Sequence, residues 1–167
     1  MIKKIFITIL LSVTLISNSY SAGSSSSGGE GDGPKTKTNY EKAVKFIKSA
    51  KKFEKKGKKD KAQSSYEKAL KLLLKSNNKK PNKPDTLNYL GFTSRKLGDF
   101  ENGEKYYLQG LAINPTHIGI NEYLGELYVA TNRMDLAQKR LAVLMNCNCK
   151  EFDQLKDVID GKKASKY

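Results

Sequence analysis

Residues 88–100 read NYLGFTSRKLGDF, and 34 residues further on the chain reads EYLGELYVATNRM at 122–134. Both stretches carry the same Leu-Gly pair, at Leu90-Gly91 and at Leu124-Gly125. Self-similarity with a period of roughly 20–50 residues indicates a solenoid or another array of stacked units. We therefore expect the chain to consist of repeated copies of one structural element.

A third copy lies upstream, with Ala50 in the place of Gly91. The residues that follow it at matching places are Phe53, Gly57, Ala62, Tyr66 and Ala69. A seven-residue insertion, NNKKPNK at 77–83, separates this copy from the next. It is rich in helix breakers, and we expect no helix to cross it. The three copies run over residues 43–76, 84–117 and 118–151.

This register resembles the tetratricopeptide repeat, whose 34-residue unit has a small residue at position 8, Gly at 15, Ala at 20 and 27 and an aromatic residue at 24. The middle copy also ends in the family's proline, at Asn114-Pro115. The resemblance implies an all-α fold, a right-handed α-solenoid of three antiparallel helix pairs with a C-terminal capping helix. It also implies a protein that binds other proteins and is not an enzyme.

Helical periodicity supports the same fold without the family. Apolar residues recur at helical spacing through 40–56, and lysines occupy the other faces. Thr38 and Glu41 are spaced as a capping box at the start of this helix, and its partner is expected at about 59–75. A closing helix is predicted at 151–161, where an apolar stripe would seal the last pair. The stripe consists of Phe152, Leu155, Val158 and Ile159.

The N-terminal residues are typical of a leader. Two lysines precede an apolar run at 5–16, and small residues follow it, which is the pattern of a secretory signal peptide at 1–21. A retained anchor is the alternative. A flexible Gly- and Ser-rich linker at 22–38 then leads to the repeat domain at 39–161 and a disordered tail at 162–167. We expect a small bacterial protein that is exported to the periplasm or secreted, without stable membrane insertion after cleavage.

Composition disfavours most enzymes. The chain has 167 residues, a formal net charge of +14, one His and two Cys. So few His and Cys argue against a His-based catalytic centre, and no motif indicates a catalytic, cofactor-binding or metal-ligating residue. His117 is expected to be an ordinary surface residue. Glu122 and Glu126 have the spacing of an acid pair, but we expect them to be solvated side chains that face a groove.

Cys147 and Cys149 are separated by one residue, where the last repeat helix gives way to the capping helix. In an oxidising compartment they are a possible disulfide. The favoured interpretation is a structural clip, or two thiols of which one is buried. The alternative is a redox-active pair, which would make the protein a periplasmic thiol–disulfide factor.

Positive charge is concentrated in the first repeat and the insertion. Residues 35–83 contain 18 Lys and 4 acidic residues, whereas 84–167 contain 11 basic and 11 acidic residues. This basic segment favours an acidic partner. The candidates are an acidic protein segment, an anionic lipid surface and a polyanion such as an envelope polymer. The alternative is that lysine serves only to solubilise the chain. Export disfavours nucleic acid as a partner in vivo.

The resemblance places a partner segment on the concave face, which the first helix of each pair forms. The candidate groove residues are Lys48, Lys51, Lys55, Asn88, Tyr89, Phe92, Arg95, Glu122 and Glu126. Some relatives hold a C-terminal carboxylate with Lys, Asn and Arg at set groove positions. Those positions are occupied here by Ile47, Lys51, Tyr89, Gly119 and Tyr123, so that mode of binding is not expected. The predicted function is a cell-envelope scaffold that binds a segment of another protein, with the basic first repeat favouring an acidic one.

Overall fold

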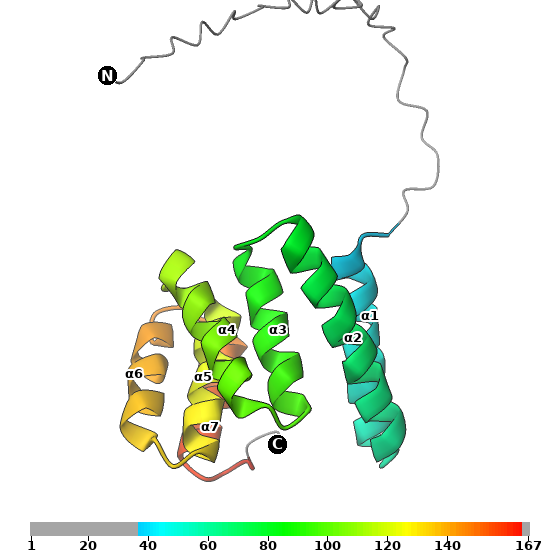
Figure 1. The fold of residues 1–167 in the computed structure, drawn as a ribbon. Coiled ribbons are helices and arrows are strands. Elements are labelled where there is room, and N and C mark those ends of the chain that lie inside the picture. Colours follow the sequence, from blue (N-terminus) through cyan, green and yellow to red (C-terminus); the bar gives the residue numbers. More distant parts are fainter. Residues whose placement is uncertain (1–36, 165–167) are drawn as a thin grey trace, which may run out of the picture. The chain divides into compact units, whose positions relative to one another are not determined.

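The computed structural model describes residues 37–164, and within them it contains helices and no strand. The helices are α1 (Asn39–Lys55), α2 (Lys59–Lys79), α3 (Pro84–Lys96), α4 (Phe100–Ile113), α5 (Ile118–Ala130), α6 (Met134–Leu144) and α7 (Lys150–Ile159) (Figure 1). In this described part, no helix has the length and apolar character needed to cross a membrane. The predicted signal peptide, nearly all of the linker and the last residues of the tail lie outside the described residues.

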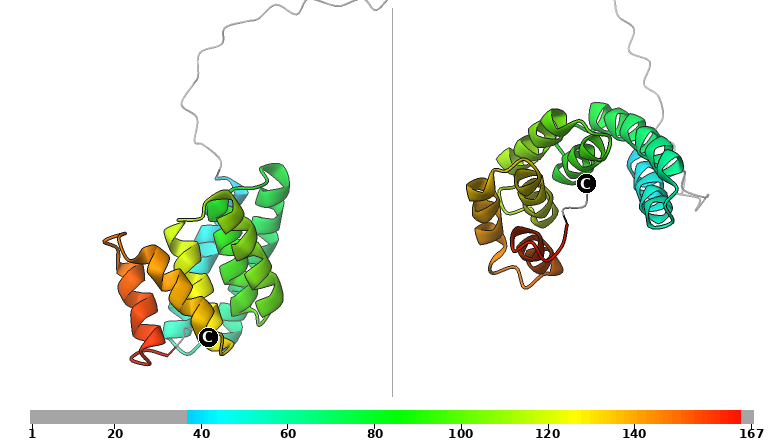
Figure 2. Two further views of the ribbon diagram at one scale, coloured as in Figure 1. Left: turned by 90° about the vertical axis from the view of Figure 1, so that its left-hand side faces the viewer. Right: turned by 90° about the horizontal axis from the view of Figure 1, so that it is seen from below.

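Consecutive helices pack as pairs, α1 with α2, α3 with α4 and α5 with α6. Within the helical unit, α1, α3 and α5 follow the inner side of an arc, and α2, α4 and α6 follow its outer side (Figure 2). The last helix, α7, packs against both α5 and α6 and so covers the end of the third pair. The predicted all-α solenoid of three helix pairs with a capping helix is confirmed.

Small residues at the repeated position allow this close packing. A Cβ atom at Gly91 of α3 would lie 2.5 Å from the ring of Tyr107 of α4, a side chain that is fully buried. A Cβ atom at Gly125 of α5 would lie 2.5 Å from Leu155 of α7. In the first pair the corresponding residue, Ala50, is also fully buried. The 34-residue register therefore reflects a steric requirement where helices meet.

The first helix begins at the predicted capping box. The N–H of Glu41 donates to Thr38 Oγ1 over 3.2 Å, and the N–H of Thr38 donates to Glu41 Oε2 over 2.8 Å. The bond from the Thr38 N–H, together with one from the Thr38 hydroxyl, holds the pKa of the Glu41 carboxyl below its usual value. Such reciprocal bonds satisfy donors that have no acceptor at the start of a helix.

The second helix ends later than the sequence predicts. We expected it to end near residue 75, whereas α2 continues to Lys79. No helix crosses the insertion at 77–83, as predicted, because α3 begins only at Pro84. Residues 77–79 all carry a backbone N–H and can extend the helix, and the true barrier is Pro81, which lacks one. Beyond it, Asn82 adopts a left-handed backbone with φ of 59° and redirects the chain toward α3.

The fifth helix starts at a side-chain cap that the sequence does not reveal. His117 Nδ1 accepts a hydrogen bond from the N–H of Ile120 over 3.1 Å, and its Nε2 lies 3.2 Å from Asp85 Oδ1. Replacing His117 with Ala should lower the free energy of unfolding by about 1 kcal/mol, the usual loss for a cap. Urea unfolding measures this. His117→Asn keeps a capping acceptor and should restore most of the loss, and equal stability of the Ala variant and the unaltered chain would contradict the prediction.

Candidate functional site

The inner helices bring a lysine and two aromatic rings into contact. Lys51 Nζ of α1 lies 4.5 Å from the ring centroid of Phe92 of α3 and 5.8 Å from that of Tyr123 of α5. The two rings are 5.1 Å apart, centroid to centroid. We call these three residues the lysine–aromatic cluster. One side chain comes from the first helix of each pair, so the cluster depends on all three pairs being stacked.

The cluster offers three kinds of contact to a bound chain. Lys51 and Tyr123 are half-buried, whereas Phe92 is buried. An ammonium this close to an aromatic face gains a cation–π interaction. Burial raises the pKa of the Tyr123 phenol far above its usual range, and the carboxyl groups of Glu122 and Glu126 add to the rise. At neutral pH the site therefore presents a cation, a hydroxyl donor and ring surface.

An ion pair lies beside the cluster, enclosed within the fold. Arg95 Nη2 is 3.3 Å from Glu126 Oε2, and both side chains are fully buried. Arg95 Nη1 also donates to the backbone carbonyl of Tyr123 over 2.6 Å. Since the guanidinium lies 5.4 Å from the ring centroid of Tyr123, the pair supports one side of the cluster. It ties α3 to α5 and so fixes the second pair against the third.

Four of the predicted groove residues are hidden from solvent. Phe92, Arg95, Glu122 and Glu126 are only 2%, 2%, 3% and 0% exposed. The expectation that the two glutamates are solvated is wrong, because α5 packs against α3, α4, α6 and α7. In this conformation these four side chains shape the groove from within and have no surface to offer a partner.

The other predicted groove residues lie on the same inner helices outside the cluster. Lys48 and Lys55 are exposed on α1. Tyr89 of α3 is half-buried, and its ring lies 5.9 Å from that of Tyr40 of α1. Asn88 is 8% exposed, and its side-chain oxygen has no hydrogen-bond partner. A binding role for these residues stays a prediction.

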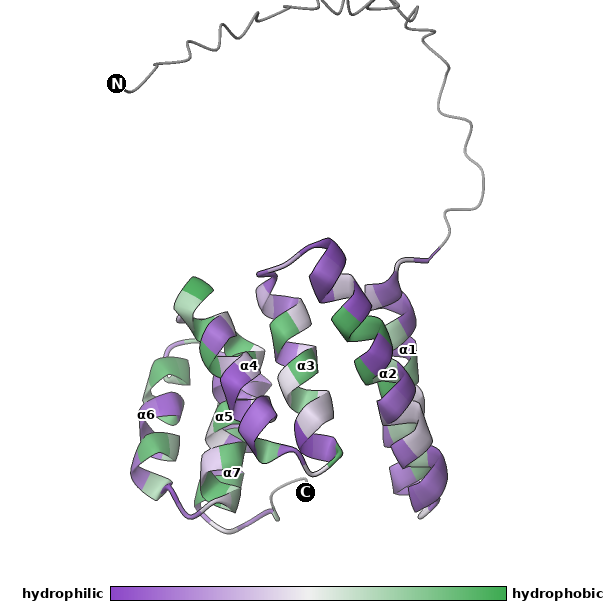
Figure 3. Ribbon diagram, viewed as in Figure 1, coloured by the Kyte–Doolittle hydropathy of each residue, from purple (hydrophilic) through white to green (hydrophobic). Residues whose placement is uncertain are grey.

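Hydrophilic residues cover much of α1 and α2 (Figure 3), and many of them are lysines. On α1, the exposed lysines include Lys48, Lys52 and Lys55, and the half-buried Lys51 reaches the cluster. Few acidic residues lie on the same two helices. The first pair therefore carries a positive potential next to the lysine–aromatic cluster.

The two cysteines form a disulfide in the connection between α6 and α7. Cys149 is also the residue that precedes the first turn of α7. The bond therefore lies where the chain turns from the last repeat into the capping helix, as expected for a structural clip. The redox alternative stays a prediction. Within the described residues, no group of three or more His, Cys, Asp or Glu side chains is arranged to hold a metal ion.

Tyr123 is a cluster residue that was absent from the predicted groove set. A signal for it exists in the sequence, since Tyr123 lies 34 residues after Tyr89 and shares its repeat position. The pattern does not reveal that Tyr123 contacts Phe92 and Lys51 while Tyr89 contacts Tyr40. That difference depends on how the pairs stack.

A family model of the tetratricopeptide repeat matches residues 50–72 and 85–117. Among solved structures, the first TPR of Spaghetti (RPAP3), bound to the HSP90 peptide SRMEEVD, is similar with a TM-score of 0.53 and 20% sequence identity. The match covers 75% of this chain and 95% of that one. No curated protein matches the chain. The two matched stretches are therefore similar to tetratricopeptide repeats, and α5 and α6 pack as a third helix pair after them.

Proposed function

We propose that the chain is a non-enzymatic scaffold whose inner face, built by α1, α3 and α5, binds a segment of another protein. Acidic side chains of that segment would meet the lysines of α1, and an apolar side chain would meet the half-buried ring of Tyr123 in the lysine–aromatic cluster. The leader-like pattern at 1–21 favours a site of action outside the cytoplasm, in the cell envelope.

The position of Lys51 is the observation that carries this proposal. Its ammonium lies over the rings of Phe92 and Tyr123, while Lys48 and Lys55 are exposed on the same helix. Residues three and four apart on a helix are neighbours, so the three cations form one stripe along α1. Like charges at this spacing repel one another, and an acidic ligand would relieve the repulsion.

The mode of binding differs from that of relatives which grip a C-terminal carboxylate. The similar solved domain is bound to an HSP90 peptide. In the present chain, two of the five positions used by such relatives hold Tyr89 and Tyr123, whose rings pack against other rings. Two more hold Ile47 and Gly119, which carry no charge. We therefore propose recognition of acidic side chains within a segment, not of a chain end.

A selection from a displayed peptide library on the full-length chain tests the proposal. It should enrich peptides in which acidic residues accompany an aromatic or aliphatic one. Affinity for a selected peptide should fall steeply as salt rises above about 0.15 M, where the screening length is about 8 Å. Changing Lys48, Lys51 and Lys55 together to Gln should weaken binding at least about 10-fold, which corresponds to about 1.4 kcal/mol.

A second triple variant is the matched control. Lys61, Lys71 and Lys75 are exposed on α2, the outer helix of the same pair, and changing them to Gln removes the same charge. This control should leave the affinity within about 2-fold of the unaltered chain, since exposed charges more than a screening length away act weakly. If both triple variants bind as tightly as the unaltered chain at every salt concentration, the lysines only solubilise the surface.

A further inference from the structure

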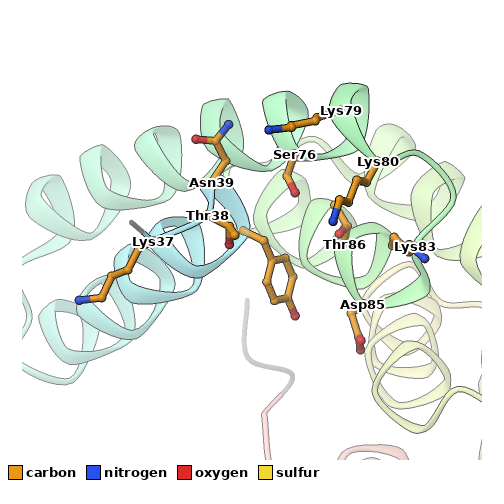
Figure 4. A pocket seen from close by; sticks show the side chains of 10 residues that line it. Lys37, Thr38, Asn39, Ser76, Lys79, Lys80, Lys83, Asp85 and Thr86 are labelled. Carbon is orange, nitrogen blue, oxygen red and sulfur yellow. The ribbon is translucent and has the colours of Figure 1, made fainter. Parts of the chain in front are cut away.

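A cavity of about 520 Å³ lies where the insertion between the first two repeats meets the N-terminal ends of α1 and α3 (Figure 4). Its lining residues are Lys37, Thr38, Asn39, Tyr40, Ser76, Lys79, Lys80, Lys83, Asp85 and Thr86. None of these belongs to the predicted groove set. Because the insertion at 77–83 supplies three of the lysines, a regular 34-residue unit would not form this cavity.

The charged residues that line the cavity are mostly cationic, with four lysines against one aspartate. Within residues 37–164, none of these four ammonium groups takes part in an ion pair. Lys80 points into the cavity, and the carboxylate of Asp85 points away from Lys80 (Figure 4). Asp85 Oδ1 lies 3.2 Å from His117 Nε2. The interior of the cavity is therefore positive.

The start of α3 adds backbone donors to this wall. The residue before the helix, Lys83, makes no side-chain capping bond, and Pro84 follows it. The first N–H groups of a helix have no acceptor within the helix, so those of Asp85 and Thr86 remain available. The helix dipole adds partial positive charge at the same end.

A hydroxyl on the cavity wall is a donor that is independent of the helix end. Thr86 is 4% exposed and lines the cavity, and its hydroxyl makes no hydrogen bond to any described residue. The hydroxyl oxygen is not enclosed by protein, so it can donate to an acceptor that enters the cavity. Tyr40 is a second donor, because burial, Asp85 and Tyr89 together raise its pKa to about 12 and the phenol keeps its proton.

We propose that this cavity binds a phosphate group, held by Lys80, the Thr86 hydroxyl and the N-terminus of α3. Phosphate presents several strong acceptor oxygens, which suits donors that approach from different sides. The cavity is larger than one phosphate group, so the rest of the ligand has room beside Tyr40. A soluble phosphorylated compound and a phospholipid headgroup share this chemistry. The inference is independent of the proposed peptide groove.

Amide NMR of the full-length chain during titration with inorganic phosphate tests the site. Ionic strength is kept constant with sodium chloride, so that screening does not change. We expect saturable shifts at the amides of Asp85 and Thr86. Lys80→Gln with Lys83→Gln should raise the dissociation constant at least about 10-fold. Lys71→Gln with Lys75→Gln removes equal charge from α2, at residues that do not line the cavity, and is the matched control, expected to stay within about 2-fold.

Thr86→Val separates binding from folding, because it removes the hydroxyl and keeps the shape of the side chain. It should weaken phosphate binding about 10-fold, as expected for a lost hydrogen bond to a charged group, without lowering the melting temperature. Three results would each overturn the proposal. One is that the amide signals of Asp85 and Thr86 do not shift. The others are that both pairs of lysine variants weaken binding equally, or that Thr86→Val binds phosphate as tightly as the unaltered chain.

Vesicles distinguish the two sources of the phosphate once free phosphate binds. If a lipid headgroup is the ligand, the chain should bind vesicles of phosphatidylglycerol. The variant with Lys80→Gln and Lys83→Gln should then not bind them. A chain that binds inorganic phosphate at Asp85 and Thr86 but ignores these vesicles takes a soluble phosphorylated compound. Both results support the phosphate site.

Discussion

Replacing Glu126 with Leu should lower the free energy of unfolding by about 3–5 kcal/mol, the usual loss when one partner of a buried ion pair is removed. Arg95 would then keep its charge inside the fold without the carboxylate that lies 3.3 Å from it. Arg95→Met should have a comparable effect, since it leaves the buried carboxylate without this guanidinium. Urea unfolding followed by circular dichroism measures both changes.

The double variant Arg95→Met, Glu126→Leu tests whether the loss comes from the unpaired charge. The loss of stability in the double variant should be smaller than the sum of the two single losses, and the difference should be at least about 2 kcal/mol. The reason is that no charge of the pair remains. Lys105→Met is the control, since Lys105 is exposed on α4 and its replacement should change stability by less than about 0.5 kcal/mol. Strict additivity of the two single losses would show that Arg95 and Glu126 act separately.

The burial of this pair shows where prediction from sequence fails. Repeat position and helical periodicity place Arg95, Glu122 and Glu126 on inner helices, which the structure confirms. A charged residue at such a position is ordinarily solvated, and nothing in its neighbours along the chain indicates otherwise. Burial arises from the packing of α5 against helices of other pairs and against α7. Which side chains pair across repeats therefore depends on how the helix pairs stack, and sequence pattern alone does not predict it.

The fold was more predictable because its constraints are local or periodic. Position 8 of each copy holds Ala50, Gly91 or Gly125, and the structure shows close contacts there that only a small residue permits. The end of α2 was missed because the asparagines at 77 and 78 do not end the helix, whereas Pro81 does. The phosphate cavity was missed for another reason. It joins Tyr40 to Thr86, and their proximity follows only from the placement of α1 beside α3.

The contact between α5 and the capping helix predicts that Gly125→Ala destabilises the chain when Leu155 is present and stabilises it when Leu155 is replaced. Leu155 is fully buried, and its side chain fills the space that a Cβ at Gly125 would occupy, 2.5 Å from Leu155 Cδ2. Leu155→Ala should cost about 2–5 kcal/mol, the range for a buried leucine. In the unaltered chain, Gly125→Ala should cost about 1–3 kcal/mol, because a methyl group is forced into a filled core.

Once Leu155 is Ala, the same change at Gly125 should become stabilising. The steric conflict is gone, and alanine is favoured over glycine inside a helix by about 1 kcal/mol. Gly110→Ala is the control, because its methyl group would meet Ile120 instead of Leu155 and should cost the same in both backgrounds. Urea unfolding of the six chains decides the matter. If Gly125→Ala is equally destabilising with and without Leu155, the capping helix does not close the solenoid through this contact, and the glycine is required for another reason.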